Sequence, residues 1–453
     1  MELSKNMIIP AKIEDFTEEG EGVARIEGRV VFVKGGVPGD TCEIRILKTE
    51  KRLAYAKLER IITPSPARIS PDCPHFPACG GCRFRHVDYD AELEYKVKHV
   101  TDCLARIGGI TLEPEKIIGA ARVEGYRNKV QYPVAKSGGR MVYGFFRAGT
   151  REVIPASRCM IQPAETDALA GAVVSLASKH GIPAYDPVSG SGCLRHICIR
   201  QARDGGLLLC LVTTGRDIPR LNALVKEIRL SHPNLRGISQ NINGKNTNVI
   251  FGRETINLWG SPTLRDEVAG VICDLSPVSF FQVNRKQAGR LYAKAGEYAG
   301  KGRLLLDLYC GTGTIGLSMA ENFERVLGIE IVPEAIENAR ANALLNGRVN
   351  AEFICGDAAV EMDRLGFADS RPDVVVVDPP RKGLSPEIIP KIAALEPDRV
   401  VYVSCNPATL ARDLKLFSAE GYAPKRLSVV DMFPRTVHVE AVVLLTRKIQ
   451  IAI

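Results

Sequence analysis

The stretch LLLDLYCGTGTIG, residues 304–316, passes from an apolar run directly into a glycine-rich loop. The apolar run predicts a buried strand, and the glycines predict a sharp turn into the first residues of a helix. Glycines at such a turn let the backbone approach a ligand closely at the helix N-terminus. Residues 311–316 match Gly-x-Gly-x-x-Gly, the dinucleotide fingerprint, but this short match is not specific when it stands alone.

The chain around this loop alternates between short apolar runs and helical segments. The further predicted strands are 325–329, 353–356, 374–377 and 400–403. Continuous apolar strands separated by helices predict a doubly wound sheet whose parallel strands are buried on both faces. Carboxylates stand at or near the ends of successive strands, where such a sheet binds its ligands: Asp307, Glu330, Asp357 and Asp378.

A cysteine follows the predicted strand 400–403, in the sequence Ser404-Cys405-Asn406-Pro407. Asn406 suits a helix N-cap and Pro407 suits the first helical position, so Cys405 directly precedes the predicted helix 408–419. The positive end of a helix dipole favours the thiolate, the reactive form of cysteine. A lone cysteine is more often an inert core residue, but this position faces the expected ligand crevice and favours a nucleophile.

Five stretches together resemble the RNA 5-methyluridine methyltransferase family: 279–284 (SFFQVN), 307–316, 378–381 (DPPR), 404–407 (SCNP) and 438–440 (HVE). The resemblance implies a fold that binds S-adenosylmethionine. It implies cofactor contacts from Gln282, Tyr309, Glu330, Asp357 and Asp378. It also implies that Phe280 stacks on the flipped target base.

The same resemblance implies that Cys405 is the nucleophile and Glu440 the proton acceptor. Uracil carbon 5 is a weak nucleophile, and a thiolate that adds to carbon 6 turns the ring into an enolate able to take a methyl group. A base must afterwards remove the proton from carbon 5. Glu440 lies in the predicted last strand, 437–445, and a partly buried carboxylate is a stronger base. His438, on the same predicted face, is the alternative base.

The first 62 residues contain short predicted strands at 30–33, 42–47 and 54–62. Such spacing predicts a small OB-like β-barrel, used either to bind nucleic acid or only for packing; it resembles the family's TRAM domain. A linker with two prolines, residues 63–66, follows, and then a helix predicted over 90–107. We therefore expect a multidomain α/β protein with three domains: the barrel (1–62), a central α+β domain (63–280) and a methyltransferase domain (281–453).

Three cysteines lie within ten positions in the second predicted domain: Cys73, Cys79 and Cys82. A tetrahedral metal ion or an iron–sulfur cubane needs a fourth ligand. The family resemblance supplies Cys159 and favours a [4Fe–4S] cluster, whereas spacing alone leaves zinc equally open. The uracil chemistry needs no redox step, so we expect the cluster to be structural or to help fold the RNA.

Composition limits the classes of protein that remain. The chain has 453 residues, 25% of them charged, a net charge of +8 and 13 cysteines. No apolar stretch is long enough to span a bilayer and no secretory leader is recognisable, so we expect a cytoplasmic, monomeric protein with reduced thiols. The mild positive charge permits an anionic partner.

The expected partner is RNA, with 23S ribosomal RNA favoured because the chain length and the cysteines resemble the ribosomal branch of the family, and transfer RNA as the alternative. An NAD-dependent oxidoreductase would leave Cys405, Glu440 and the Asp378-Pro379-Pro380 turn without a role. A non-catalytic RNA-binding protein would not need both Cys405 and Glu440.

Overall fold

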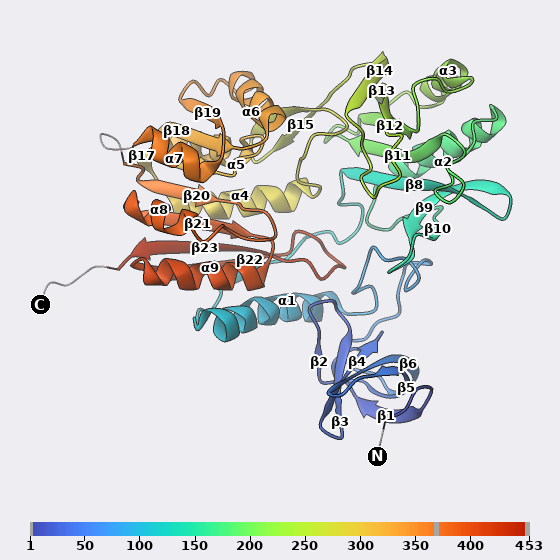
Figure 1. The fold of residues 1–453 in the computed structure, drawn as a ribbon, viewed down its shortest axis with the longest axis horizontal. Helices are drawn as coiled ribbons and strands as arrows, with labels where there is room; N and C mark the ends of the chain where they lie inside the picture. Colours follow the sequence, from blue (N-terminus) through green and yellow to red (C-terminus); the bar gives the residue numbers. More distant parts are fainter. Residues whose placement is uncertain (1–2, 367–370, 449–453) are drawn as a thin grey trace, which may run out of the picture.

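The structure, a computed structural model, describes residues 3–366 and 371–448. Its N-terminal part is a six-stranded barrel (Figure 1) in the strand order β1-β5-β6-β4-β3-β2. Side chains alternate between buried and exposed along its strands, as expected for a sheet with one face in a core. The strands are β1 (Ile8–Lys12), β2 (Asp15–Phe16), β3 (Gly22–Ile26), β4 (Arg29–Lys34), β5 (Thr41–Thr49) and β6 (Leu53–Thr63).

The helix after the barrel, α1 (Tyr89–Cys103), ends in a short π-helical turn, Leu104–Gly108, and Gly109 closes it in the left-handed conformation. The position of the predicted helix 90–107 is therefore confirmed, but its last turn is wider than a turn of an α-helix. Figure 1 shows α1 lying between the barrel and the C-terminal sheet.

A second sheet of seven strands forms the central part of the molecule, in the order β10-β9-β8-β11-β12-β13-β14. One of its faces packs on two helices, α2 (Ala164–Lys179) and α3 (Leu221–Ser231). Its strands are β8 (Lys129–Ser137), β9 (Arg140–Phe146), β10 (Val153–Pro155), β11 (Leu194–Gln201), β12 (Leu207–Thr213), β13 (Leu235–Ile242) and β14 (Glu254–Gly260).

The third sheet has eight strands in the order β19-β18-β17-β20-β21-β23-β22-β7. The strands predicted at 304–306, 325–329, 353–356, 374–377 and 400–403 are confirmed, and they are parallel to one another. The strands are β7 (Lys116–Ile118), β17 (Gly302–Leu308), β18 (Phe323–Glu330), β19 (Ala351–Cys355), β20 (Val374–Val377), β21 (Arg399–Ser404), β22 (Tyr422–Val430) and β23 (Glu440–Arg447).

One strand of this sheet, β23, runs antiparallel to both of its neighbours. It begins at Glu440, whereas the sequence predicted a strand from residue 437; residues 437–439 belong to the loop after β22. The predicted alternation that placed His438 and Glu440 on one face of a strand is therefore wrong. The edge strand β7 pairs in parallel with β22, so residues before the central sheet complete the C-terminal one.

Helices cover both faces of the eight-stranded sheet (Figure 1). On one face of the sheet the helices share a core with α1, and on the other face the helices include α4. Alternate residues of the same apolar strands point into the two cores. A hairpin of β15 (Leu264–Val268) and β16 (Val271–Leu275) packs beside α4. The helices are α4 (Arg285–Ala299), α5 (Thr314–Met319), a 3-10 turn (Ala320–Asn322), α6 (Pro333–Leu345), α7 (Ala358–Leu365), α8 (Ile388–Ala394) and α9 (Pro407–Ala419).

The multidomain α/β architecture predicted from the sequence is confirmed. The predicted boundaries at 62/63 and 280/281 stay predictions, and the outermost residues of the first and last predicted domains, 1–2 and 449–453, lie outside the described residues. Among the described residues, no helix combines the length and the apolar character needed to cross a bilayer.

Candidate active site and cysteine-lined cavity

The glycine-rich loop joins the end of β17 to α5 and lies at the carboxyl ends of the parallel strands, the edge at which such sheets bind their ligands, here called the crevice. Tyr309 has a φ of 63°, a strained conformation for a residue with a side chain. Gly311, two residues after Tyr309, donates its backbone N–H to the Glu330 carboxylate at 3.2 Å. Buried Asp307 accepts the backbone N–H of Gly316 at 3.0 Å, and burial raises its pKa to about 7.

Two other predicted cofactor residues, Asp378 and Asp357, follow strands β20 and β19 and so lie at the same edge of the sheet. Asp378 follows β20, makes no hydrogen bond or ion pair within the described residues, and has its pKa raised to about 7 by removal from water. Asp357 lies at the exposed N-cap of α7, where its carboxylate accepts the backbone N–H groups of Ala359 and Val360. Gln282 is partly buried in the segment before α4. A negatively charged crevice of this kind suits a cationic ligand.

Cys405 lies between the end of β21 and the N-cap of α9. Asn406 caps the helix, and its side chain accepts the N–H groups of Ala408 and Thr409, as the sequence predicts. Burial raises the pKa of the Cys405 thiol to about 11, and Glu440 and Asp378 add to the rise. In the free protein the thiol is therefore protonated at neutral pH, contrary to what its position before a helix alone predicts.

Glu440 reaches Cys405 because β23 is antiparallel. Ala441 pairs with Ser404, so the first residue of β23 lies at the same edge of the sheet as the last residues of β21. The Glu440 side chain is buried, and this burial, followed by the nearby Asp378, raises its pKa well above the usual range. A carboxyl group in such surroundings binds a proton more tightly than one in water.

His438 and Arg381 complete this edge of the crevice. A guanidinium nitrogen of Arg381 lies 3.4 Å from Nε2 of His438. Removal from water, and then the charge of Arg381, lowers the pKa of His438. Arg381 also opposes the upward shifts at Cys405 and Glu440. The sequence analysis assigned no role to Arg381, although its position directly after the Asp378-Pro379-Pro380 turn was the signal available.

Phe280 projects from a segment that the central sheet holds in place, and its side chain is 74% exposed. Arg200 of β11 donates to the carbonyl of Ser279. The side chain of Asn128 donates to the carbonyl of Gln282 at 2.9 Å, and its backbone N–H donates to Val283 at 2.8 Å. Because the backbone before and after Phe280 is held by these hydrogen bonds, the ring projects into solvent from a fixed position in the chain.

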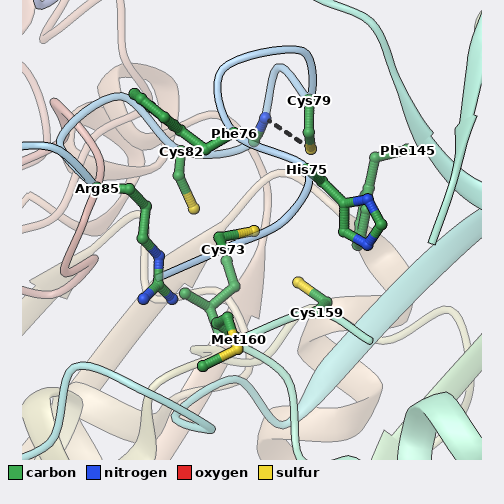
Figure 2. Close-up of a pocket in the computed structure, with 11 residues that line it drawn as sticks. Cys73, His75, Phe76, Cys79, Cys82, Arg85, Phe145, Cys159 and Met160 are labelled. Carbon is green, nitrogen blue, oxygen red and sulfur yellow. Dashed lines mark hydrogen bonds between the residues drawn. The ribbon is translucent and has the colours of Figure 1, made fainter. Parts of the chain in front are cut away.

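All four predicted metal-binding cysteines line one cavity of about 40 Å³ (Figure 2). Three of them come from one turn, Cys73, Cys79 and Cys82, and Cys159 comes from the segment before α2. In Figure 2 their sulfur atoms point toward a common space. The cavity is several times larger than the roughly 10–15 Å³ that a single water needs, so it has room for a group bigger than one small ligand atom.

The surroundings of the four thiols fit an anionic group. Arg85 lines the cavity with its side chain almost fully buried, and its Nε and Nη2 atoms have no hydrogen-bond partner. Burial raises the pKa of Cys82 to about 11 and that of Cys159 to about 12, so these thiols would ionise only on binding a metal. Within residues 3–366 and 371–448, however, no three His, Cys, Asp or Glu side chains are arranged to hold a metal ion.

Comparison with known proteins defines the class. Residues 271–448 match the family described as tRNA (Uracil-5-)-methyltransferase, and residues 5–58 match the TRAM domain. Uncharacterized RNA methyltransferases of Bacillus cereus and Clostridium acetobutylicum are each 42% identical, with 98% of both chains covered. The crystal structure of the Pyrococcus abyssi tRNA (uracil-54, C5)-methyltransferase, in complex with S-adenosyl-L-homocysteine, has a TM-score of 0.78 at 26% identity, covering 97% of this chain and 100% of that one.

The fold and these relatives define an RNA methyltransferase. Within that class, the chain belongs to the RNA uracil-5-methyltransferase family and carries an N-terminal TRAM domain. The predicted family is thereby confirmed, and an NAD-dependent oxidoreductase is excluded.

Proposed function

We propose that this protein methylates carbon 5 of a uridine in RNA with S-adenosylmethionine as methyl donor. The observation that carries the proposal is the meeting of Cys405 and Glu440 at the edge of the crevice beside Asp378. A protein that only bound RNA would not need a thiol and a buried carboxyl group at this point. The protein acts in the cytoplasm as a monomer.

The crevice fits the proposed cofactor. We assign cofactor contacts to Gln282, Tyr309, Glu330, Asp357 and Asp378, and the S-adenosyl-L-homocysteine complex of the Pyrococcus relative supports the class of ligand. When bound, S-adenosylmethionine supplies an electrophilic methyl group on a positively charged sulfur. The unpaired Asp378 carboxylate gives the crevice a charge that complements this cation.

The two central side chains act before and after methyl transfer. Phe280 stacks on the flipped uracil, and Cys405, once it has lost its proton to solvent, adds as the thiolate to carbon 6, which gives carbon 5 the electron density to take the methyl group; S-adenosylhomocysteine would be the leaving group. Glu440 then accepts the proton from carbon 5. The electron pair of that C–H bond forms the carbon 5–carbon 6 double bond, the carbon 6–sulfur bond breaks, and the Cys405 thiolate leaves.

The two roles are tested by variants that fail at different steps. Cys405→Ala should bind RNA but form neither covalent adduct nor product. Glu440→Gln keeps the shape of the side chain but cannot take the proton, so methylated RNA should stay attached to Cys405. A denaturing gel of each variant incubated with unmodified RNA and S-adenosylmethionine separates them. Release of product by Glu440→Gln at the wild-type rate, with no slow-migrating band, would assign the proton to another base, with His438 the first candidate.

We also propose that Cys73, Cys79, Cys82 and Cys159 hold a [4Fe–4S] cluster, whose negative charge the buried Arg85 balances. Protein purified without oxygen should be brown and contain about four iron atoms per chain, as a cubane on four thiolates requires. Cys79→Ala should remove the iron and leave the affinity for S-adenosylhomocysteine nearly unchanged. One zinc per chain and no iron would contradict the cluster and favour a mononuclear site.

The RNA that we favour is 23S ribosomal RNA, on the family resemblance of the chain length and the cysteines. Transfer RNA is the second candidate, because the Pyrococcus relative is named for uracil 54 of tRNA and shares the architecture over nearly the whole chain. Mapping 5-methyluridine in total RNA with and without the gene decides between them. Loss of the mark from 23S RNA alone supports the first, and loss from tRNA alone supports the second.

A further inference from the structure

The loop that leads into Glu440, residues 431–439, connects β22 to β23 and is largely buried. A buried irregular segment must find a hydrogen-bond partner for each backbone carbonyl, since an unpaired one is costly. Five consecutive carbonyls of this loop, those of residues 431–435, accept hydrogen bonds from other parts of the chain.

The first two carbonyls accept hydrogen bonds from side chains at the start of α4. Nε2 of Gln287 donates to the carbonyl of Asp431 at 2.9 Å. Nδ2 of Asn284, the N-cap of this helix, donates to the carbonyl of Met432 at 3.0 Å. This half of the loop is therefore fixed by the C-terminal part of the chain itself.

The half nearer Glu440 is held from the N-terminal third of the chain. The hydroxyl of Tyr126 donates to the carbonyl of Pro434 at 3.1 Å. The backbone N–H groups of Arg83 and Phe84 both donate to the carbonyl of Arg435, at 2.9 and 3.2 Å. Arg83 directly follows Cys82, so the cysteine turn and the loop before Glu440 are joined by hydrogen bonds.

Helix α1 reinforces the same half. Arg435 has a φ of 70°, a strained conformation that persists only where its surroundings fix it. Its backbone N–H donates to the buried carboxylate of Glu92 at 2.7 Å, and its guanidinium donates to the carbonyl of Val87 at 2.8 Å. The ammonium of Lys96 lies 3.3 Å from the carbonyl of Phe433.

We propose that Tyr126 and the backbone of residues 83–84 are positioning groups for Glu440, and that an ordered cysteine turn is needed for the step in which the proton leaves carbon 5. This inference rests on the proposed function. It gives the cysteine-lined site a task in a reaction without electron transfer: the site fixes the turn, and the turn fixes the loop that buries the base.

The expected defect is specific to one step. Glu440 is 5% exposed, and its raised pKa comes first from burial. Releasing the loop admits water, which lowers that pKa toward its usual value and weakens the base. Cys405 lies at the junction of β21 and α9 and is not part of the loop. Addition of the thiolate should therefore continue while release of the methylated RNA slows.

The test compares two partly buried tyrosines. Tyr126→Phe removes only the hydroxyl that binds Pro434. Tyr143→Phe is the matched control, because its hydroxyl donates to the carbonyl of Asp167 in the central domain at 3.0 Å. We expect Tyr126→Phe, but not Tyr143→Phe, to slow decay of the covalent adduct roughly five- to tenfold, the effect of one lost buried hydrogen bond. In Tyr126→Phe the rate of backbone amide hydrogen exchange in residues 433–438 should also rise.

A second pair of variants addresses the cysteine turn itself. Arg83→Pro removes the N–H that binds Arg435, and Arg83→Ala removes the same side chain but keeps the N–H. We expect Arg83→Pro to accumulate more trapped adduct than Arg83→Ala. The two variants should have equal affinity for S-adenosylhomocysteine and equal iron content.

The outcomes separate this inference from the proposed function. If neither the wild-type protein nor Glu440→Gln ever forms a covalent adduct, the proposed function fails. If Glu440→Gln traps RNA while Tyr126→Phe and Arg83→Pro resolve the adduct like their controls, the positioning role is wrong and the proposed function stands.

Discussion

Glu440 raises the pKa of the Cys405 thiol, and Asp378 raises the pKa of both groups, in a place where burial already disfavours their charged forms. Arg381 is the cation that opposes this effect at both groups. The free protein therefore stores its nucleophile as a thiol, which limits attack by oxidants and alkylating agents. A cation placed beside Asp378 would offset its negative charge and so lower the pKa of the Cys405 thiol.

This charge balance predicts opposite effects of two substitutions on the free protein. Asp378→Asn removes a negative charge, which lowers the pKa of the Cys405 thiol and should speed its alkylation at pH 9 by roughly three- to tenfold. Arg381→Met removes the opposing cation, raises that pKa and should slow alkylation by a similar factor. The measurement is the rate of iodoacetamide labelling of Cys405 as a function of pH.

The control for this experiment is Asp398→Asn. Asp398 is exposed just before β21, at the amino end of the strand that carries Cys405 at its other end, and it does not affect the Cys405 pKa. Equal labelling rates for Asp378→Asn and the wild type would show that Asp378 does not act on the thiol.

At the scale of single elements, the glycine loop between β17 and α5 is the most constrained. Gly313 has a φ of 77°, and a Cβ atom there would lie 2.8 Å from the ring of Phe353. Gly311 has a φ of 55°, but a Cβ atom there would meet nothing within 4 Å. The two glycines therefore serve different purposes. Gly313 allows close packing against Phe353, whereas Gly311 leaves an open backbone at the crevice.

Alanine at these two positions should separate strain from steric overlap. Gly311→Ala should cost about 1 kcal/mol of stability, the price of the left-handed conformation alone. Gly313→Ala adds overpacking against Phe353, roughly 1–3 kcal/mol more, and should also weaken binding of S-adenosylhomocysteine. Thermal unfolding and calorimetric titration measure the two effects. Equal unfolding temperatures for the variants would contradict the packing role of Gly313.

Local sequence patterns predicted most elements but misjudged their ends. The run Val374–Val377 and the N-cap at Asn406 lie where the sequence predicts them, because burial and capping depend on a few neighbouring residues. The alternation of Val437 and Val439 resembles a strand, yet these residues lie in a loop. Contacts of the loop with α1, α4 and the cysteine turn decide its path, and no short window of sequence contains those partners.

At the scale of the whole molecule, the N-terminal third is an integral part of the catalytic unit. Strand β7 completes the eight-stranded sheet, and α1 and the π-helical turn after it contribute Val100 and Leu104 to its core. The barrel is attached through a small apolar cluster in which Phe16 packs on Phe84 and Tyr95, and through polar contacts such as the ion pair of Lys98 with Asp15 at 2.7 Å.

Two truncations test this division. A chain that begins at residue 64 should fold and bind S-adenosylhomocysteine, with weaker affinity for RNA. A chain that begins at residue 119 lacks α1 and β7, which exposes apolar core and an unpaired sheet edge, so it should aggregate. Light scattering and calorimetry measure both results. Soluble, cofactor-binding protein from the shorter chain would show that the sheet is complete without β7.

The sequence by itself determined the glycine loop, the succession of apolar strands, the acidic residues at their ends and the cysteine before a capped helix, since each is encoded within a few residues. The tertiary structure decided which distant residues meet: Glu440 beside Cys405, through the antiparallel direction of β23, and Cys159 beside the turn of Cys73, Cys79 and Cys82. It also revealed Arg381 and the buried loop 431–439, about which the sequence analysis was silent. The physical reason is that backbone preferences and burial patterns act locally, whereas strand pairing and side-chain contacts between remote segments are selected only when the whole core packs.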